Sequence, residues 1–314
     1  MPPSRWAASP PTCAKPSGDR RVIGARKTFD ALERGLALLA TRRPGLALSG
    51  ADALGRLRNR LSRRWPSPEQ VHLLFPHLDR RATARVAWSL GALEARNRLL
   101  ISCIGRAGLD PVRPLVRTSQ DAFAALRPPL VLGTFHVGAV QALGAVVERL
   151  PGPVLILRQG LLHTPRPPVE IVSTDGDDQS RAASFQRALA HLAGGGFVVL
   201  ALDVVQGAGF QVPCLGRTLA LARGPFALAR LAGTPLVPLV ARWRRGGVEA
   251  EAGEELAVDP TLDPADREAA LAVSAGRWLE RYLLDSPSEL SLGLLRILLA
   301  NASAPPSISS RRNS

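Results

Sequence analysis

The chain has 314 residues, of which 46% are apolar, so a wholly disordered protein is excluded and the length fits one large domain or two small ones. The formal net charge is +14. Residues 1–65 carry 14 basic and 4 acidic side chains, a net of +10, which leaves +4 for residues 66–314. Because the body of the chain is nearly balanced, we expect no nucleic-acid partner.

The two ends of the chain have the composition of disordered segments. Residues 1–27 are rich in proline, serine and arginine and lack the apolar stretch of a signal peptide, so we predict a disordered basic arm. Residues 301–314 are predicted to be a disordered tail. The three cysteines, Cys13, Cys103 and Cys214, are far apart in the sequence and form no Cys-x-x-Cys pair. We therefore expect no metal site, no disulfide framework and no bound cofactor.

Two apolar stripes at helical spacing predict basic amphipathic helices between residues 28 and 65. The first stripe is Phe29, Leu32, Leu36 and Leu39, and the second is Leu54, Leu57, Leu61 and Trp65. Arginines surround the second stripe, as in helices that lie on an anionic membrane. A surface helix that packs on the core and keeps its arginines in solvent explains the same pattern equally well. No segment is typical of a transmembrane helix.

Residues 67–109 are expected to be helical, and after Pro128 short apolar strands alternate with helices. Strands are predicted at 130–132, 154–157, 197–202, 236–242 and 248–251, and helices at 137–149, 181–193, 225–233, 265–285 and 288–299. The first strand, helix and second strand predict a βαβ unit and hence a parallel pair of strands. The fold class is therefore α/β: a single domain over 28–300, with a mixed, largely parallel central sheet flanked by helices and a helical N-terminal section.

His136 is the leading candidate for a catalytic residue. In the segment VLGTFHVGAVQALG it follows an apolar strand and precedes a predicted helix. Sites in open α/β sheets lie at the carboxyl ends of strands, and the ordinary pKa of histidine suits a general base. A lone histidine more often satisfies loop backbone groups. However, Arg158 and Asp203 end two other predicted strands, so a base, a cation and a carboxylate share one edge of the sheet, which suits acyl transfer.

Several segments together resemble one known family. They include VHLLFPHLDRRATARVA, GTFHVGAVQALG, VLILRQG, the block from LAGGGFVVLALD to PLVPLVARW, and WLERYLLDSPSELSLGLLRIL. In order and spacing, over roughly residues 50–297, they resemble the bacterial lipid A biosynthesis acyltransferases, the late lauroyl and myristoyl transferases of the lysophospholipid acyltransferase-like superfamily.

The resemblance implies transfer of an acyl group from an acyl carrier protein or coenzyme A thioester to a hydroxyl group. His136 would be the general base, supported by a carboxylate five residues later, and Arg158 would neutralise the developing oxyanion or hold the acceptor. The resemblance also assigns Gly138, Gly216 and Arg217 to substrate binding.

The chain departs from the family at Gln141, which stands where the acid of the motif belongs. A glutamine can fix the histidine tautomer but cannot stabilise an imidazolium by charge, and the corresponding acid-to-amide change in a serine protease costs about 10⁴ in kcat. Either another carboxylate serves, with Asp203 the first candidate and Glu170 the second, or the protein is slow, altered in substrate or inactive.

The sequence thus predicts an O-acyltransferase that works at a membrane surface on a lipid or glycolipid acceptor. It would lie on the cytoplasmic face of the bacterial inner membrane, peripheral or weakly anchored, and contact anionic lipid through residues 28–65. The alternative is a catalytically degenerate homologue that binds lipid or an acyl carrier without turnover.

Overall fold

The structure is a computed structural model that describes residues 31–40, 42–62, 66–119, 123–159, 166–205, 209–244, 246–257 and 260–301. The predicted arm at 1–27 and residues 302–314 of the predicted tail lie outside these ranges, as do Phe29 and Trp65 and the side chain of Leu61.

A six-stranded sheet forms the centre of the molecule, in the order β3-β2-β4-β1-β7-β8. Its strands are β1 (Leu130–Thr134), β2 (Val154–Arg158), β3 (Val169–Ser173), β4 (Phe197–Ala201), β7 (Leu236–Arg244) and β8 (Gly247–Ala252). The first five of these in the sheet order run parallel, and β8 runs antiparallel to β7. The predicted α/β class, with a mixed and largely parallel sheet in a single domain, is confirmed.

Two local predictions need correction. The strands β1 and β2 are parallel but are not neighbours, because β4 lies between them. Residues of β4 are buried on both sides, as a central position in the sheet requires. The helix predicted at 137–149 is shorter, comprising η3 (Val140–Ala142) and α5 (Leu143–Val147). Gly138 has a φ of 57°, which no residue inside a right-handed helix adopts, so the helix starts later.

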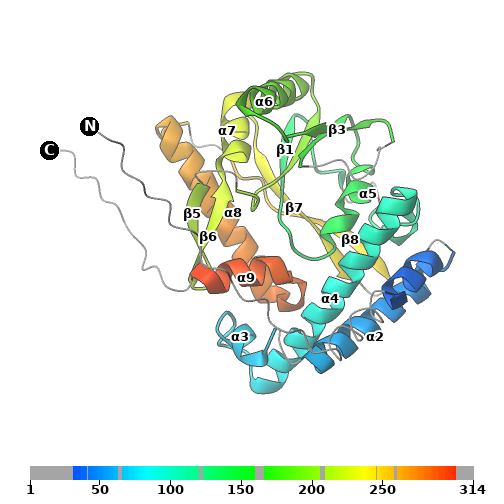
Figure 1. The fold of residues 1–314 in the computed structure, drawn as a ribbon. Coiled ribbons are helices and arrows are strands. Elements are labelled where there is room, and N and C mark those ends of the chain that lie inside the picture. Colours follow the sequence, from blue (N-terminus) through cyan, green and yellow to red (C-terminus); the bar gives the residue numbers. More distant parts are fainter. Residues whose placement is uncertain are drawn as a thin grey trace, which may run out of the picture.

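Helices cover both faces of the sheet (Figure 1). One face packs against α6 (Asp178–Ala193), α7 (Arg223–Ala232), α8 (Pro264–Asp285) and α9 (Leu292–Ala300). The other packs against α4 (Arg80–Ala107) and α5. Alternate residues of each strand serve the two cores, so Val131 faces the first set and Leu132 the second. The stretch predicted to be helical at 67–109 consists of α3 (Pro68–His72) and α4, and residues 73–79 between them are not helical.

The N-terminal section is a helical layer on the outer side of α4. There α2 (Pro44–Ser62) lies along α4 through small residues, and a Cβ atom at Gly55 would lie 2.4 Å from the carbonyl oxygen of Gly91. Because of this close packing, only part of the second predicted apolar stripe, Leu54, Leu57, Leu61 and Trp65, faces α4. Leu54 is buried, whereas Leu57 is 48% exposed. Among the described residues, no helix is long and apolar enough to cross a bilayer.

A two-stranded hairpin of β5 (Gly209–Cys214) and β6 (Arg217–Ala222) stands outside the main sheet and was not predicted. Its two-residue turn uses Leu215 and Gly216, which have φ values of 51° and 67°. The turn lacks the usual Asn-Gly signal for two positive φ angles. The base of the hairpin leads directly into α7, which brings the start of that helix to the edge of the sheet.

Candidate active site

The structure brings His136 and Asp203 together at the carboxyl edge of the sheet. Thr134 ends β1 and pairs in register with Ala201, which ends β4. His136 and Asp203 each follow two residues later, so they leave neighbouring strands at the same height. The Asp203 carboxylate accepts the backbone N–H of His136 at 2.8 Å through Oδ2, and its Oδ1 lies 2.7 Å from ring nitrogen Nδ1.

This double contact fixes the tautomer and the direction of the imidazole. A carboxylate can only accept, so Nδ1 carries the proton and Nε2 keeps its lone pair. The side chain of Asp203 is 3% exposed while that of His136 is 46% exposed, so the acid is shielded from water and the ring is open to a substrate. The hydrogen bond with Asp203 raises the pKa of His136, whereas burial and the charge of Arg158 lower it. This is the arrangement of a general base.

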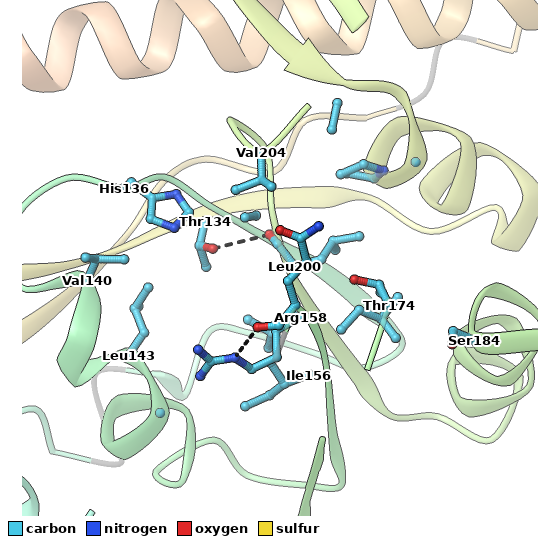
Figure 2. A pocket seen from close by; sticks show the side chains of 18 of the residues that line it. Thr134, His136, Val140, Leu143, Ile156, Arg158, Thr174, Ser184, Leu200 and Val204 are labelled. Carbon is cyan, nitrogen blue, oxygen red and sulfur yellow. Dashed lines mark hydrogen bonds between the residues drawn. The ribbon is translucent and has the colours of Figure 1, made fainter. Parts of the chain in front are cut away.

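Arg158 ends β2 on the other side of β4. Figure 2 shows its guanidinium and the ring of His136 on the side of the cavity that Val140 and Leu143 line. Within the described chain, the hydrogen bond of Arg158 is a long one, from Nε to the Gln159 carbonyl at 3.4 Å. Burial lowers the pKa of Arg158, and no carboxylate among the described residues contributes to that pKa. A partly buried cation without a carboxylate partner suits an anionic group, or negative charge that develops during a reaction.

His136 and Arg158 open into a cavity of about 530 Å³ that reaches both faces of the sheet at this edge. Its arm on the α4 and α5 face, here called the apolar arm, is lined by Ile104, Val140, Leu143, Val147, Ile156 and Val199. Its arm on the α6 and α7 face, here called the polar arm, is lined by Thr174, Arg181, Ser184, Phe185, Arg223 and Pro225. In Figure 2 the ring of His136 and the guanidinium of Arg158 lie on the side of Val140 and Leu143, which belong to the apolar arm, and Thr174 and Ser184 of the polar arm lie on the other side. The cavity therefore has room for an apolar chain and a polar group at once.

The other two residues considered as partners of His136 lie elsewhere. Gln141 lines the same cavity, but the residue that accepts the hydrogen bond from His136 Nδ1 is Asp203. Glu170 is the second residue of β3, pairs in register with Leu155 at the amino half of β2, and forms an ion pair with Arg187. The carboxylate beside the histidine is thus brought by strand order and not by the helix that follows His136.

The predicted substrate-binding residues are not among those that line the cavity. Gly138 is buried below the His136 loop, where a Cβ atom would lie 2.4 Å from the carbonyl oxygen of Ala241. Gly216 and Arg217 lie at the tip of the hairpin, whereas its base, at Ala222, lines the cavity. Five residues of extended strand separate them, roughly 17 Å. The structure therefore places Gly216 and Arg217 away from His136 and Arg158, and it places Gly138 beside His136 in the chain but off the wall of the cavity.

Several residues of the site carried no sequence signal that we used. Arg223 begins α7 at the cavity and stacks on Phe210, with its Cζ atom 4.9 Å from the ring centroid. Arg181, in the first turn of α6, lines the polar arm and pairs with Asp178. An arginine directly after a strand, in front of a Gly-Pro pair, was a usable signal for Arg223. The place of Arg181 in the site could not be predicted without knowing where α6 lies.

Comparison of the sequence with models of known protein families and with curated proteins finds no match.

Proposed function

We propose that this protein is a membrane-surface O-acyltransferase, which moves a fatty acyl group from an acyl carrier protein or coenzyme A thioester to a hydroxyl of a lipid or glycolipid. The observation that carries the proposal is the pairing of His136 Nδ1 with the buried Asp203 carboxylate at the mouth of a cavity with an apolar and a polar arm. The resemblance to the lipid A acyltransferases gives the reaction class.

In this reaction His136 Nε2 accepts the proton of the acceptor hydroxyl as its oxygen attacks the thioester carbonyl carbon. Asp203 keeps the ring oriented and stabilises the imidazolium that forms. Arg158 offsets the negative charge on the former carbonyl oxygen. When the tetrahedral intermediate collapses, the C–S bond breaks and the thiolate takes the proton from Nε2. The products are an ester and a free thiol, and the enzyme returns to its starting state.

The two arms of the cavity suit the two parts of an acyl thioester. The apolar arm would hold the hydrocarbon chain, because burying each methylene contributes about 0.8 kcal/mol. The polar arm would receive the hydrophilic part, because Arg181 and Arg223 line it and phosphate groups of a pantetheine arm or lipid headgroup are anionic. The thioester carbonyl would then lie beside His136 and Arg158, at the end of the apolar arm. No bound cofactor is needed for this chemistry.

The N-terminal helical layer supports contact with a lipid surface. Exposed leucines and arginines lie in residues 31–40, in the turn at 42–43 and in α2, namely Leu32, Leu38, Leu46, Leu57, Arg42, Arg43 and Arg56. Leucine side chains gain free energy on entering the acyl boundary of a bilayer, and arginines gain from anionic headgroups. We propose peripheral binding at the cytoplasmic face of the bacterial inner membrane, where both an acyl thioester and a lipid acceptor are available.

The alternative function is binding of a lipid or acyl carrier without turnover. The sequence feature that supports this alternative is Gln141, which stands where the motif has an acidic residue. Because Asp203 meets Nδ1 of His136, that argument is weaker, and a Gln141→Glu variant distinguishes the two functions. In an active enzyme the substitution changes the rate by no more than a few fold, since the ring already has its carboxylate. In an impaired enzyme it raises the rate, and a protein that only binds shows no turnover in either form.

The test is release of free thiol by the purified full chain, supplied with palmitoyl-CoA or lauroyl acyl carrier protein and vesicles of bacterial lipid extract. Mass spectrometry of the vesicles identifies the ester. We expect thiol release that depends on lipid and is lost in His136→Ala. Turnover retained in that variant would overturn the mechanism, and no thiol release with any donor would overturn the function.

A further inference from the structure

The loop that carries His136 is fixed from behind at Gly138. Gly138 donates its backbone N–H to the carbonyl oxygen of Glu289 at 2.7 Å, and its own carbonyl accepts the side-chain Nδ2–H of Asn97 at 2.9 Å. The next residue, Ala139, donates its N–H to the carbonyl of Ala241 at 2.6 Å. Asn97 comes from α4 and Glu289 from η4 (Pro287–Glu289), two elements outside the strands that carry the site.

Asn97 and Glu289 are buried polar side chains, 8% and 7% exposed, and the hydrogen bonding of Asn97 is incomplete. The Asn97 Oδ1 atom has no hydrogen-bond partner within the described chain. The Glu289 carboxylate accepts one hydrogen bond from the described residues, a long one from the backbone N–H of Trp243 at 3.4 Å. A buried polar group without adequate partners costs about 1–3 kcal/mol. Fold stability alone therefore does not favour an asparagine at position 97, whereas Glu289 lines a second, polar cavity together with Arg96 and Arg244.

The Glu289 side chain also occupies the space that a side chain at position 138 would need. A Cβ atom on Gly138 would lie 2.6 Å from its Oε2. Burial raises the pKa of Glu289 to about 7, while the hydrogen bond from Trp243 and the charges of Arg242, Arg96 and Arg244 lower it. The carboxyl group thus packs against the bend of the loop as a partly neutral group.

We propose that Asn97 and Glu289 are positioning residues for His136. The two hold Gly138 in its left-handed conformation, which sets where the loop leaves β1, while Asp203 holds the imidazole from β4. If the contacts at Gly138 loosen, the ring moves away from Asp203 and from the productive geometry. The inference rests on the proposed role of His136 as the general base.

The test uses the full chain with four variants. Asn97→Ala removes the bond to the Gly138 carbonyl. Glu289→Ala removes the packing, and Glu289→Gln keeps both shape and acceptor and serves as the rescue. Leu99→Ala is the matched control, because Leu99 is 3% exposed on α4 but packs toward α2, away from the loop.

Two readouts separate positioning from stability. The titration of His136 is followed by NMR with ¹³C-labelled histidine, its signal being assigned by loss in His136→Gln, and thiol release is measured on the same samples. We expect Asn97→Ala and Glu289→Ala to lower the pKa of His136 by half a unit or more, since the bond to Asp203 weakens. We expect turnover to fall at least tenfold at unchanged KM, within the roughly 10² that a 1 Å displacement can cost.

Glu289→Gln and Leu99→Ala should keep the wild-type titration and turnover, although Leu99→Ala lowers the melting temperature at least as much as Asn97→Ala. The proposal is overturned if the two loop variants behave as Leu99→Ala does. If either variant does not fold, amide hydrogen exchange is measured on the wild-type chain. The proposal requires the Gly138 amide hydrogen to exchange slowly, and exchange at the rate of an exposed loop contradicts it. The titration and exchange need no substrate, so a failure of the acyltransferase function is distinguishable from a failure of this inference.

Discussion

Asp203 Oδ1 lies 2.7 Å from His136 Nδ1, although 67 residues separate them in the chain. The pair depends on β4 lying next to β1 in the sheet. The motif that the sequence resembles has its carboxylate five residues after the histidine, at the position of Gln141. In this chain the same contact is made across two strands, and the residue five positions on is free to be a glutamine that lines the cavity.

Asp203→Asn should lower both the rate and the pKa of His136. The bond with Asp203 raises this pKa above the ordinary 6.5, so the rate of the wild type rises with pH through a midpoint above 6.5 as the imidazole becomes neutral. Without the carboxylate charge, burial and Arg158 remain and both lower the pKa, so the midpoint falls below 6.5. By analogy with serine proteases kcat drops by about 10⁴. A pH–rate profile of thiol release checks both effects, and an unshifted midpoint would refute the assignment.

Arg158→Gln should shift the same midpoint in the opposite direction. The charge of Arg158 lowers the pKa of His136, so its removal raises that pKa and moves the rise in rate to higher pH. The plateau rate falls by about 10²–10³, as when one group that stabilises an oxyanion is lost. Arg187→Gln is the control, because Arg187 is an exposed arginine paired with Glu170 on the edge strand. If both variants lose equal activity, Arg158 has no special role.

Filling the apolar arm should shorten the acyl chain that the enzyme prefers. Ile104 is 3% exposed and lines that arm, whereas Ile101, on the same helix, is 44% exposed. Ile104→Trp should lower the rate with palmitoyl-CoA relative to decanoyl-CoA by about tenfold or more, since overpacking by 1–3 kcal/mol corresponds to such a factor. Ile101→Trp should leave the ratio unchanged. Unaltered chain preference in Ile104→Trp would place the acyl chain elsewhere.

Leucines of α2 should contribute to vesicle binding. Leu46 and Leu57 are 56% and 48% exposed, and a double change to glutamine should weaken flotation with anionic vesicles by about tenfold, because partial burial of each leucine contributes on the order of 1 kcal/mol. Leu231→Gln, at a 53% exposed leucine of α7, should have no effect. Binding that is insensitive to the double change, or equal with zwitterionic vesicles, would contradict a role for this layer.

Alanine substitutions at two glycines should have opposite effects on stability. Gly138→Ala meets the Ala241 carbonyl and Glu289 and strains a positive φ, so it should lower the free energy of unfolding by about 2 kcal/mol or more. Gly105→Ala, in α4 with open space around it, should raise it by up to about 1 kcal/mol. Urea denaturation measures both, and equal effects would mean that the loop at 138 adapts easily.

The strands that position the site were predictable because they are short continuous apolar runs. This holds for β1, β2, β4 and β7, which are buried on both faces. The strand β3 was missed, since Glu170 interrupts its apolar run and prolines precede it. The hairpin of β5 and β6 was missed because Pro213 lies within one strand and its turn lacks the usual residues.

His136, Arg158 and Asp203 were each predicted from the sequence, but which carboxylate contacts His136 was not. The sequence placed His136, Arg158 and Asp203 at strand ends and ranked Asp203 before Glu170 as the partner of His136, but the contact itself depends on the strand order. Asn97 had an unused signal, because it is a polar residue four positions after Leu93 and three before Leu100, two buried residues of the same helix. No local pattern links it to Gly138, which lies 41 residues away.

The position of β4 between β1 and β2 has a consequence for how the protein is made. A nascent chain that has emerged only as far as β2 holds the histidine and the arginine but lacks the strand that separates them, so neither can occupy its final place. Insertion of β4 closes the gap in the sheet and delivers Asp203 in the same event. The segment that completes the middle of the sheet therefore also brings the carboxylate beside His136, while β7, β8 and the helices α7, α8 and α9 follow later in the chain. A chain truncated before residue 203 lacks Asp203, the partner of His136 Nδ1.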